Sequence, residues 1–147
     1  MATYFTSAGR PALLTACAIV SNIQSFVSRN NDPLNPLVVN VGEMHAGQRY
    51  NIVANHAELY GTTRTYSPEF RQKIENGLRR IAENTAAAFG ATATLEYERF
   101  ANLPRSNDDD DLNKIAHDAA VKLYGEECLK ELPKMMGSED FASLPTR

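Results

Sequence analysis

Residues 37–66 decide the fold and read LVVNVGEMHAGQRYNIVANHAELYGTTRTY. Leu37, Val39 and Val41 occupy every second position of the first part, which is the pattern of a β-strand. Gly47 and its polar neighbours mark a turn. A longer strand is then predicted from about residue 50 to residue 66. Because a short turn joins two extended segments, the stretch predicts an antiparallel β-hairpin.

The two faces of the longer strand differ in character. Side chains of a strand point alternately to opposite sides, which separates this segment into two sets. The small or apolar set is Ala57, Leu59, Gly61, Thr63 and Thr65. The polar and aromatic set is Glu58, Tyr60, Thr62, Arg64 and Tyr66. We therefore expect helices to cover the first face and leave the second open, either as plain solvent-facing surface or as a contact surface.

An amphipathic helix is predicted over residues 11–29. Apolar residues recur there with helical spacing, and the expected buried face comprises Leu13, Cys17, Val20, Ile23 and Val27. A secretory signal is the alternative for an apolar segment near the N-terminus. Polar residues continue through the second half of the segment, which favours a helix of a folded cytoplasmic domain and argues against a membrane span.

A second helix has clear boundary signals. Ser67 is a good N-cap, Pro68 suits the first helical position, and Gly90 can end the helix. The expected apolar face comprises Phe70, Ile74, Leu78, Ile81, Thr85 and Phe89. The other face carries Arg71, Lys73, Arg79 and Arg80, which would suit a phosphate-binding stripe. Glutamates are interleaved with these cations, so an ordinary solvated face is the better interpretation.

The order of elements predicts a ferredoxin-like split βαβ sandwich over residues 1–100. A weak strand at Ala2–Ser7 precedes the first helix, and an alternating segment at 91–100 follows the second. This is an α+β fold with a four-stranded antiparallel sheet and two helices on one face. A further helix is expected at about 109–124. The run of aspartates at its start suits the helix dipole better than a calcium site.

Composition and motifs exclude several kinds of site. The 15 basic and 18 acidic residues give a net charge of −3, which argues against a nucleic-acid partner. A tight turn at Gly47 would place His45 opposite Tyr50 and His56 opposite Val39, too far apart for a shared metal ion. The sequence holds no nucleophile motif or glycine-rich phosphate loop. We therefore expect neither a catalytic residue nor a metal ligand in this chain.

Several motifs resemble the lid domain of the metal-dependent aminoacylases, amidohydrolases and carboxypeptidases. They are Val41-Gly42, His45-Ala46-Gly47, Asn51-Ile52-Val53, the segment ELYGTTRT at 58–65, and MGSEDF at 136–141. The resemblance implies that residues 1–100 form a lid and dimerisation domain. Residues 101–147 would then be a segment returning to a catalytic domain, including the helix at about 109–124 and the MGSEDF loop.

The resemblance also implies an activity for the complete enzyme. Such enzymes hydrolyse N-acyl amino acids or peptides with two divalent metals, zinc or manganese, bound in the catalytic domain. This chain lacks that metal site and alone is expected to be inactive. A homodimer is expected through the strand at about Leu37–Met44, at the sheet edge.

Asn51 and Arg64 are the residues expected to contact substrate. The Asn51 amide can donate to a carbonyl oxygen, and the Arg64 guanidinium can bind a carboxylate. The structural alternatives are a turn-capping amide for Asn51 and an ion pair with Glu58 for Arg64.

Three departures from the family pattern accompany the resemblance. Gly9-Arg10 stands where the family commonly has Gly-His, Ala54 replaces an expected proline, and residues 1–12 match poorly. A stand-alone ferredoxin-like module that binds a small ligand or regulates another protein is the alternative function. An RNA-recognition module is disfavoured, because the open sheet face carries an acidic residue.

Overall fold

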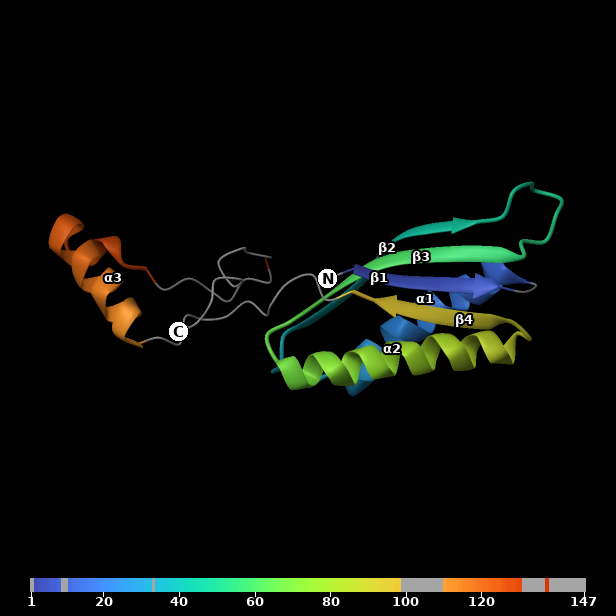
Figure 1. Ribbon diagram of the computed structural model, residues 1–147, viewed down its shortest axis with the longest axis horizontal. Helices are drawn as coiled ribbons and strands as arrows, with labels where there is room; N and C mark the ends of the chain where they lie inside the picture. The colour runs from blue at the N-terminus through green and yellow to red at the C-terminus, as the bar shows by residue number, and fades with distance from the viewer. Residues whose placement is uncertain (1, 9–10, 33, 99–109, 131–136, 138–147) are drawn as a thin grey trace.

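The computed structural model describes residues 2–8, 11–32, 34–98, 110–130 and 137. Its elements follow the predicted order (Figure 1). The strands and helices are β1 (Ala2–Ala8), α1 (Ala12–Asn30), β2 (Leu37–Ala46), β3 (His56–Thr65), α2 (Pro68–Ala88), β4 (Thr92–Tyr97), α3 (Asp110–Tyr124) and the short 3₁₀-helix η1 (Glu126–Cys128).

The strands form one antiparallel sheet in the order β2-β3-β1-β4. Helices α1 and α2 lie side by side on one face of this sheet (Figure 1). The predicted α+β, ferredoxin-like class is confirmed. The strand with the weakest sequence signal, β1, lies inside the sheet between β3 and β4, so its backbone is paired on both sides.

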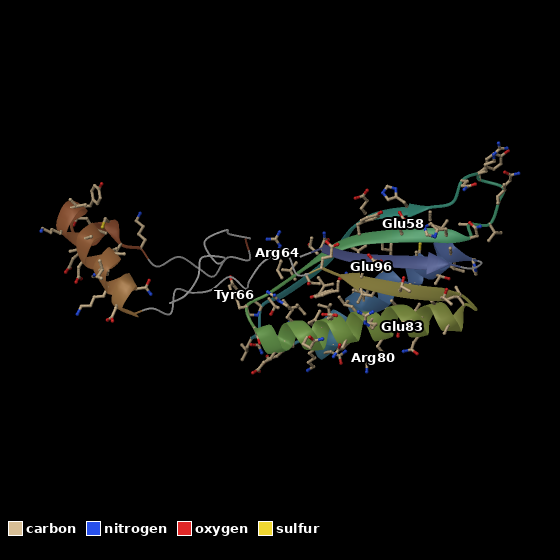
Figure 2. All side chains as sticks on the ribbon, viewed as in Figure 1. Glu58, Arg64, Tyr66, Arg80, Glu83 and Glu96 are labelled. Carbon is tan, nitrogen blue, oxygen red and sulfur yellow. The ribbon has the colours of Figure 1, made fainter. Side chains whose placement is uncertain are left out.

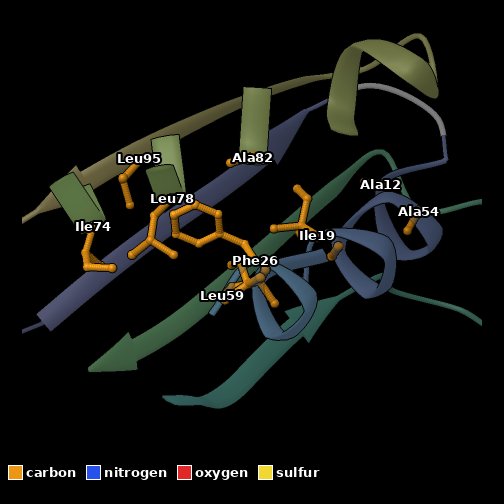
Figure 3. Close-up of a cluster of buried hydrophobic side chains, with 12 residues drawn as sticks. Ala12, Ile19, Phe26, Ala54, Leu59, Ile74, Leu78, Ala82 and Leu95 are labelled. Atoms are coloured by element: carbon orange, nitrogen blue, oxygen red, sulfur yellow. The ribbon is translucent and has the colours of Figure 1, made fainter. Parts of the chain in front are cut away.

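The hydrophobic core lies between the sheet and the two helices (Figure 3). On β3, Ala57 and Leu59 point into it while Glu58 and Tyr60 point to the open face, as predicted. The predicted buried face of α1 is confirmed for Ile23, is partly buried at Val20 and Val27, and is wrong for Leu13 and Cys17. The fully or nearly buried side chains of α1 are Ala12, Thr15, Ala16, Ile19, Ile23 and Phe26, whereas Leu13 and Cys17 are exposed.

Close packing explains why α1 buries a face that differs from the predicted one. Small residues at Ala12 and Ala16 let the helix backbone approach the rest of the core, whereas hydrophobic periodicity alone favours the larger Leu13 and Cys17. Phe26 packs directly over Gly77 of α2, where an added Cβ would lie 2.2 Å from the ring. The α1–α2 contact therefore requires glycine at position 77 unless the ring moves.

Helix α2 begins where the sequence predicts. The Ser67 hydroxyl accepts a hydrogen bond from the backbone N–H of Phe70 at 3.2 Å. Ile74 and Leu78 are buried, and Gly90 adopts the left-handed conformation just after the helix, with φ of +67°. Phe89 departs from the prediction, because it is partly exposed at the C-terminal end of the helix.

The hairpin loop is longer than predicted. Strand β3 begins at His56 and not near Tyr50, which leaves residues 47–55 as a loop. The end of this loop packs against the start of α1 and does not pair in the sheet. Ala54 is nearly buried there, and its carbonyl accepts a 3.0 Å hydrogen bond from the N–H of Ala12. No local sequence pattern indicates this tertiary contact, so the sequence places the start of β3 too early.

Helix α3 packs mainly against η1, and Gly125, with φ of +82°, ends it. Ile115, Leu123 and Tyr124 are exposed on it. The first aspartates of its acidic run, and the MGSEDF segment apart from Gly137, lie outside the described residues. In the part of the chain that the structure describes, no helix combines the length and apolar character needed to cross a membrane.

Candidate functional site

A cluster of polar side chains occupies the open sheet face near the hairpin loop. It consists of Glu43, His45, His56, Glu58 and Tyr60 and is termed the hairpin cluster. The Glu58 carboxylate accepts hydrogen bonds from His56 Nε2 at 3.1 Å and from the Tyr60 hydroxyl at 2.9 Å. The His45 ring meets Tyr60 edge-on with 5.7 Å between centroids, and its Nε2 pairs with the Glu43 carboxylate.

The hairpin cluster corrects the predicted placement of the histidines. His45 lies opposite Glu58, and His56 precedes Glu58 by two positions on the same face, so both imidazoles flank one carboxylate. The expected partners Tyr50 and Val39 are wrong, because β3 starts later than assumed. The alternation of His56, Glu58 and Tyr60 on one face of the strand is visible in the sequence. Their contact with His45 depends on the register between β2 and β3, which the sequence does not show.

The hairpin cluster shifts the titration of Glu58. The hydrogen bond from His56, followed by that from Tyr60, holds the pKa of the Glu58 carboxyl below its ordinary value. Positive charge on either imidazole acts in the same direction. Among the described residues, no three histidine, cysteine or acidic side chains are grouped so that they could hold a metal ion. The cluster is therefore a hydrogen-bonded surface network.

Replacing Glu58 by glutamine should change how stability depends on pH. A carboxyl whose pKa is lowered by folding contributes stability above its unfolded pKa of about 4.3, and loses it as pH falls through the folded value. The unfolding free energy of wild type minus that of Glu58→Gln should therefore be largest above about pH 4.5 and shrink at lower pH. Urea unfolding at several pH values measures this difference in unfolding free energy. Glu83→Gln on α2 serves as the control. A pH-independent difference would contradict the assignment.

Asn51 lies in the exposed loop between the hairpin strands. Its neighbours Tyr50 and Ile52 line a hollow of about 540 Å³ between the loop and the start of α1. A smaller hollow of about 260 Å³ joins Ile52 to His56 and Glu58 of the hairpin cluster. Tyr50 is fully exposed and Ile52 is 54% exposed, so Asn51 projects from an apolar loop at the free end of the sandwich.

Arg64 lies at the other end of β3, on the open face opposite Val38 (Figure 2). A strand advances about 3.3 Å per residue, so Arg64 is about 20 Å from Glu58 along the strand. The expected ion pair between them is wrong at that separation. Because the loop that carries Asn51 lies at the His56 end of β3, nearly the whole strand lies between Asn51 and Arg64.

The start of β1 and the end of β4 both lie at the Arg64 end of the sandwich. Thr3 pairs with Tyr97, so the start of β1 and the end of β4 lie side by side. Ala2 pairs with Thr62, which places Arg64 just beyond that end. The loop that carries Asn51 lies at the opposite end of the sheet (Figure 1).

Residues 3–89, more than half of the chain, match the family described as the peptidase dimerisation domain of the M20 peptidases. The chain belongs to this family. The matched range begins within β1.

Similar proteins include two curated enzymes and a solved structure. N-acetylcysteine deacetylase of Bacillus subtilis is 37% identical over 131 residues, covering 88% of this chain and 33% of that protein. N-acetyldiaminopimelate deacetylase of Streptococcus sanguinis is 36% identical, covering 95% and 37% respectively. A dinuclear metal-binding M20 peptidase from Bacillus subtilis superimposes with a TM-score of 0.76 at 28% identity, covering 97% of this chain and 36% of the other. The chain thus spans about a third of its relatives' length.

Proposed function

We propose that this chain is the lid and dimerisation part of a metal-dependent amidohydrolase that acts on N-acyl amino acids or peptides. The observation that carries the proposal is the family match over residues 3–89, together with deacetylases three times longer. The family match disfavours the alternative of a stand-alone regulatory module. A cytoplasmic location stays a prediction.

The complete enzyme is proposed to use two divalent metals, zinc or manganese, bound outside this domain. The described residues do not fit such a centre, because no three candidate ligands converge in them. The hairpin cluster has two imidazoles, but its carboxylates already accept hydrogen bonds from them. No catalytic step is therefore assigned to these side chains.

The domain division proposed is a lid at residues 1–100 and a returning catalytic segment at 101–147. Exposed apolar side chains on α3 support it, because Ile115, Leu123 and Tyr124 have no apolar cover among the described residues. Apolar helix faces of this kind normally pack against a protein surface. The rest of the catalytic domain is the surface that we propose for α3.

Asn51 and Arg64 are proposed to contact substrate in different active sites of a dimer. An N-acyl amino acid is about 10 Å long, taking about 3.3 Å per extended residue, whereas β3 alone spans a greater distance between the two residues. Arg64 lies at the end of the sandwich where β1 begins and β4 ends, on the side of the segment proposed to return to the catalytic domain, so we assign it to the active site of its own subunit. Asn51 projects from the free end, so we assign it to the active site of the second subunit.

Dimerisation is proposed to occur through β2, which lies at the edge of the sheet. An edge strand presents unpaired backbone N–H and C=O groups that another strand can complete. Light scattering of this chain at moderate concentration should give twice the 16.2 kDa mass of one copy. A strict monomer under those conditions would count against dimerisation through this domain.

A further inference from the structure

The hairpin loop, residues 47–55, has few contacts that fix its orientation. Ala54 is buried against the start of α1, whereas the other residues of the loop are exposed. Among the backbone groups of the described residues, only the Ala54 carbonyl bonds from this loop to another element, and a second bond, from the Ile52 N–H to the Arg49 carbonyl at 3.2 Å, lies within the loop. Segments with few buried contacts open locally at low cost in free energy. The orientation of Asn51 therefore depends on the groups at the base of the loop.

The hairpin cluster lies at this base. His45 is the penultimate residue of β2 and His56 is the first residue of β3, so the two imidazoles flank the two ends of the loop. Glu58 connects these ends, because it accepts the 3.1 Å hydrogen bond from His56 and lies opposite His45 in the ladder. Tyr60 adds a second connection, since its hydroxyl donates to Glu58 and its ring contacts the His45 ring.

The hydrogen bond between His56 and Glu58 favours one direction in which the loop leaves the sheet. Side chains two positions apart lie on the same face only while the backbone is extended. The bond therefore stabilises the strand conformation of the first residue of β3, at the junction with the loop. The last paired residues of the two strands are Ala46 and Ala57, so strand pairing alone does not fix His56.

The hollow of about 260 Å³ lies between the loop and the hairpin cluster. Ile52 and Val53 line it from the loop, and His56 and Glu58 line it from the strand. Glu58 lies toward the loop end of β3 (Figure 2). Because Ile52 directly follows Asn51 in the chain, a change in the side chains below the hollow is transmitted to Asn51 over a short distance.

We propose that the hairpin cluster positions Asn51 for the reaction, with His56 and Glu58 as the positioning pair. This inference rests on the proposed function, in which Asn51 donates to the substrate carbonyl in the active site of the second subunit. Without the bond between His56 and Glu58, the loop leaves the productive orientation for part of the time. The rate then falls with the fraction of molecules in which Asn51 is in place.

A double-mutant cycle in the complete enzyme tests this role. His56→Ala should lower kcat about three- to tenfold, the effect of losing one hydrogen bond, and should leave KM nearly unchanged. In the Asn51→Ala background, the same substitution should leave kcat unchanged, because the group that His56 positions is already absent. His56→Gln should restore most of kcat, since the amide nitrogen of glutamine stands as many bonds from the backbone as histidine Nε2 and can donate to Glu58.

His117→Ala is the matched control. His117 is an exposed histidine of α3, outside the hairpin cluster, and its Nδ1 lies 3.1 Å from the Asp118 carboxylate. This variant should retain the kcat of wild type, and thermal unfolding of each variant identifies any loss of folding.

The outcomes separate this inference from the function on which it rests. Wild-type kcat in His56→Ala, losses that multiply in the double variant, or an equal loss in His117→Ala would overturn the positioning role and leave the role proposed for Asn51 standing. Wild-type kcat in Asn51→Ala would overturn both roles.

Discussion

Replacing Asn51 by alanine in the complete enzyme should lower kcat by about 10²–10³. That is the typical cost of removing one donor to an oxyanion. The Asn51 amide lies in an exposed apolar loop, where a docked subunit would exclude water and strengthen its hydrogen bond to a developing negative charge. Because such a donor acts mainly in the transition state, KM should change little.

Asn55→Ala provides a matched control for Asn51→Ala. Asn55 is also an exposed asparagine of the 47–55 loop, and it lines the smaller hollow beside His56 and Glu58. Steady-state kinetics on an N-acetyl amino acid, with thermal unfolding of each variant, would separate catalysis from folding. Wild-type kcat in Asn51→Ala, or an equal loss in Asn55→Ala, would support the turn-capping interpretation of Asn51.

Arg64→Ala should mainly raise KM, by about 10- to 100-fold. A hydrogen bond to a charged group contributes about 1.5–3 kcal/mol, and about 1.4 kcal/mol corresponds to a factor of ten. A substrate carboxylate carries its charge in both the ground state and the transition state, so its loss weakens binding without slowing the chemical step.

Arg80→Ala is the control for Arg64→Ala. Arg80 is an exposed cation on α2, in the helix layer on the other side of the sheet (Figure 2). The Arg80→Ala substitution removes one positive charge but changes no side chain on the open face of the sheet. For substrates that lack the carboxylate, wild type and Arg64→Ala should have the same KM. An unchanged KM for carboxylate substrates, with a lower unfolding temperature alone, would make Arg64 a structural residue.

The sequence correctly predicts those element ends that depend on a nearby capping or turn residue. Ser67 and Gly90 set the ends of α2 through a side-chain cap and a left-handed residue, so both can be read without tertiary information. The two faces of β3 follow from alternation alone. The buried face of α1 could not be predicted in this way, because Ala12 and Ala16 are buried by their close packing and not by their hydrophobicity.

The candidate site depended on register and on tertiary contacts. Contact of Ala54 with the start of α1 lengthens the hairpin loop, and this one displacement brings His45 and His56 to Glu58. Asn51 and Arg64 were selected through family resemblance. Their placement at opposite ends of β3 follows from the sheet register, which no single motif contains.

We propose that this chain supplies a dimerising lid, while the metal centre lies in another part of the enzyme. Calorimetric titration of the 147-residue chain with Zn²⁺ tests it most directly. We expect only weak surface binding, since the described side chains offer no convergent set of ligands. A stoichiometric site with micromolar affinity would contradict the account, because the chain would then carry a metal centre of its own.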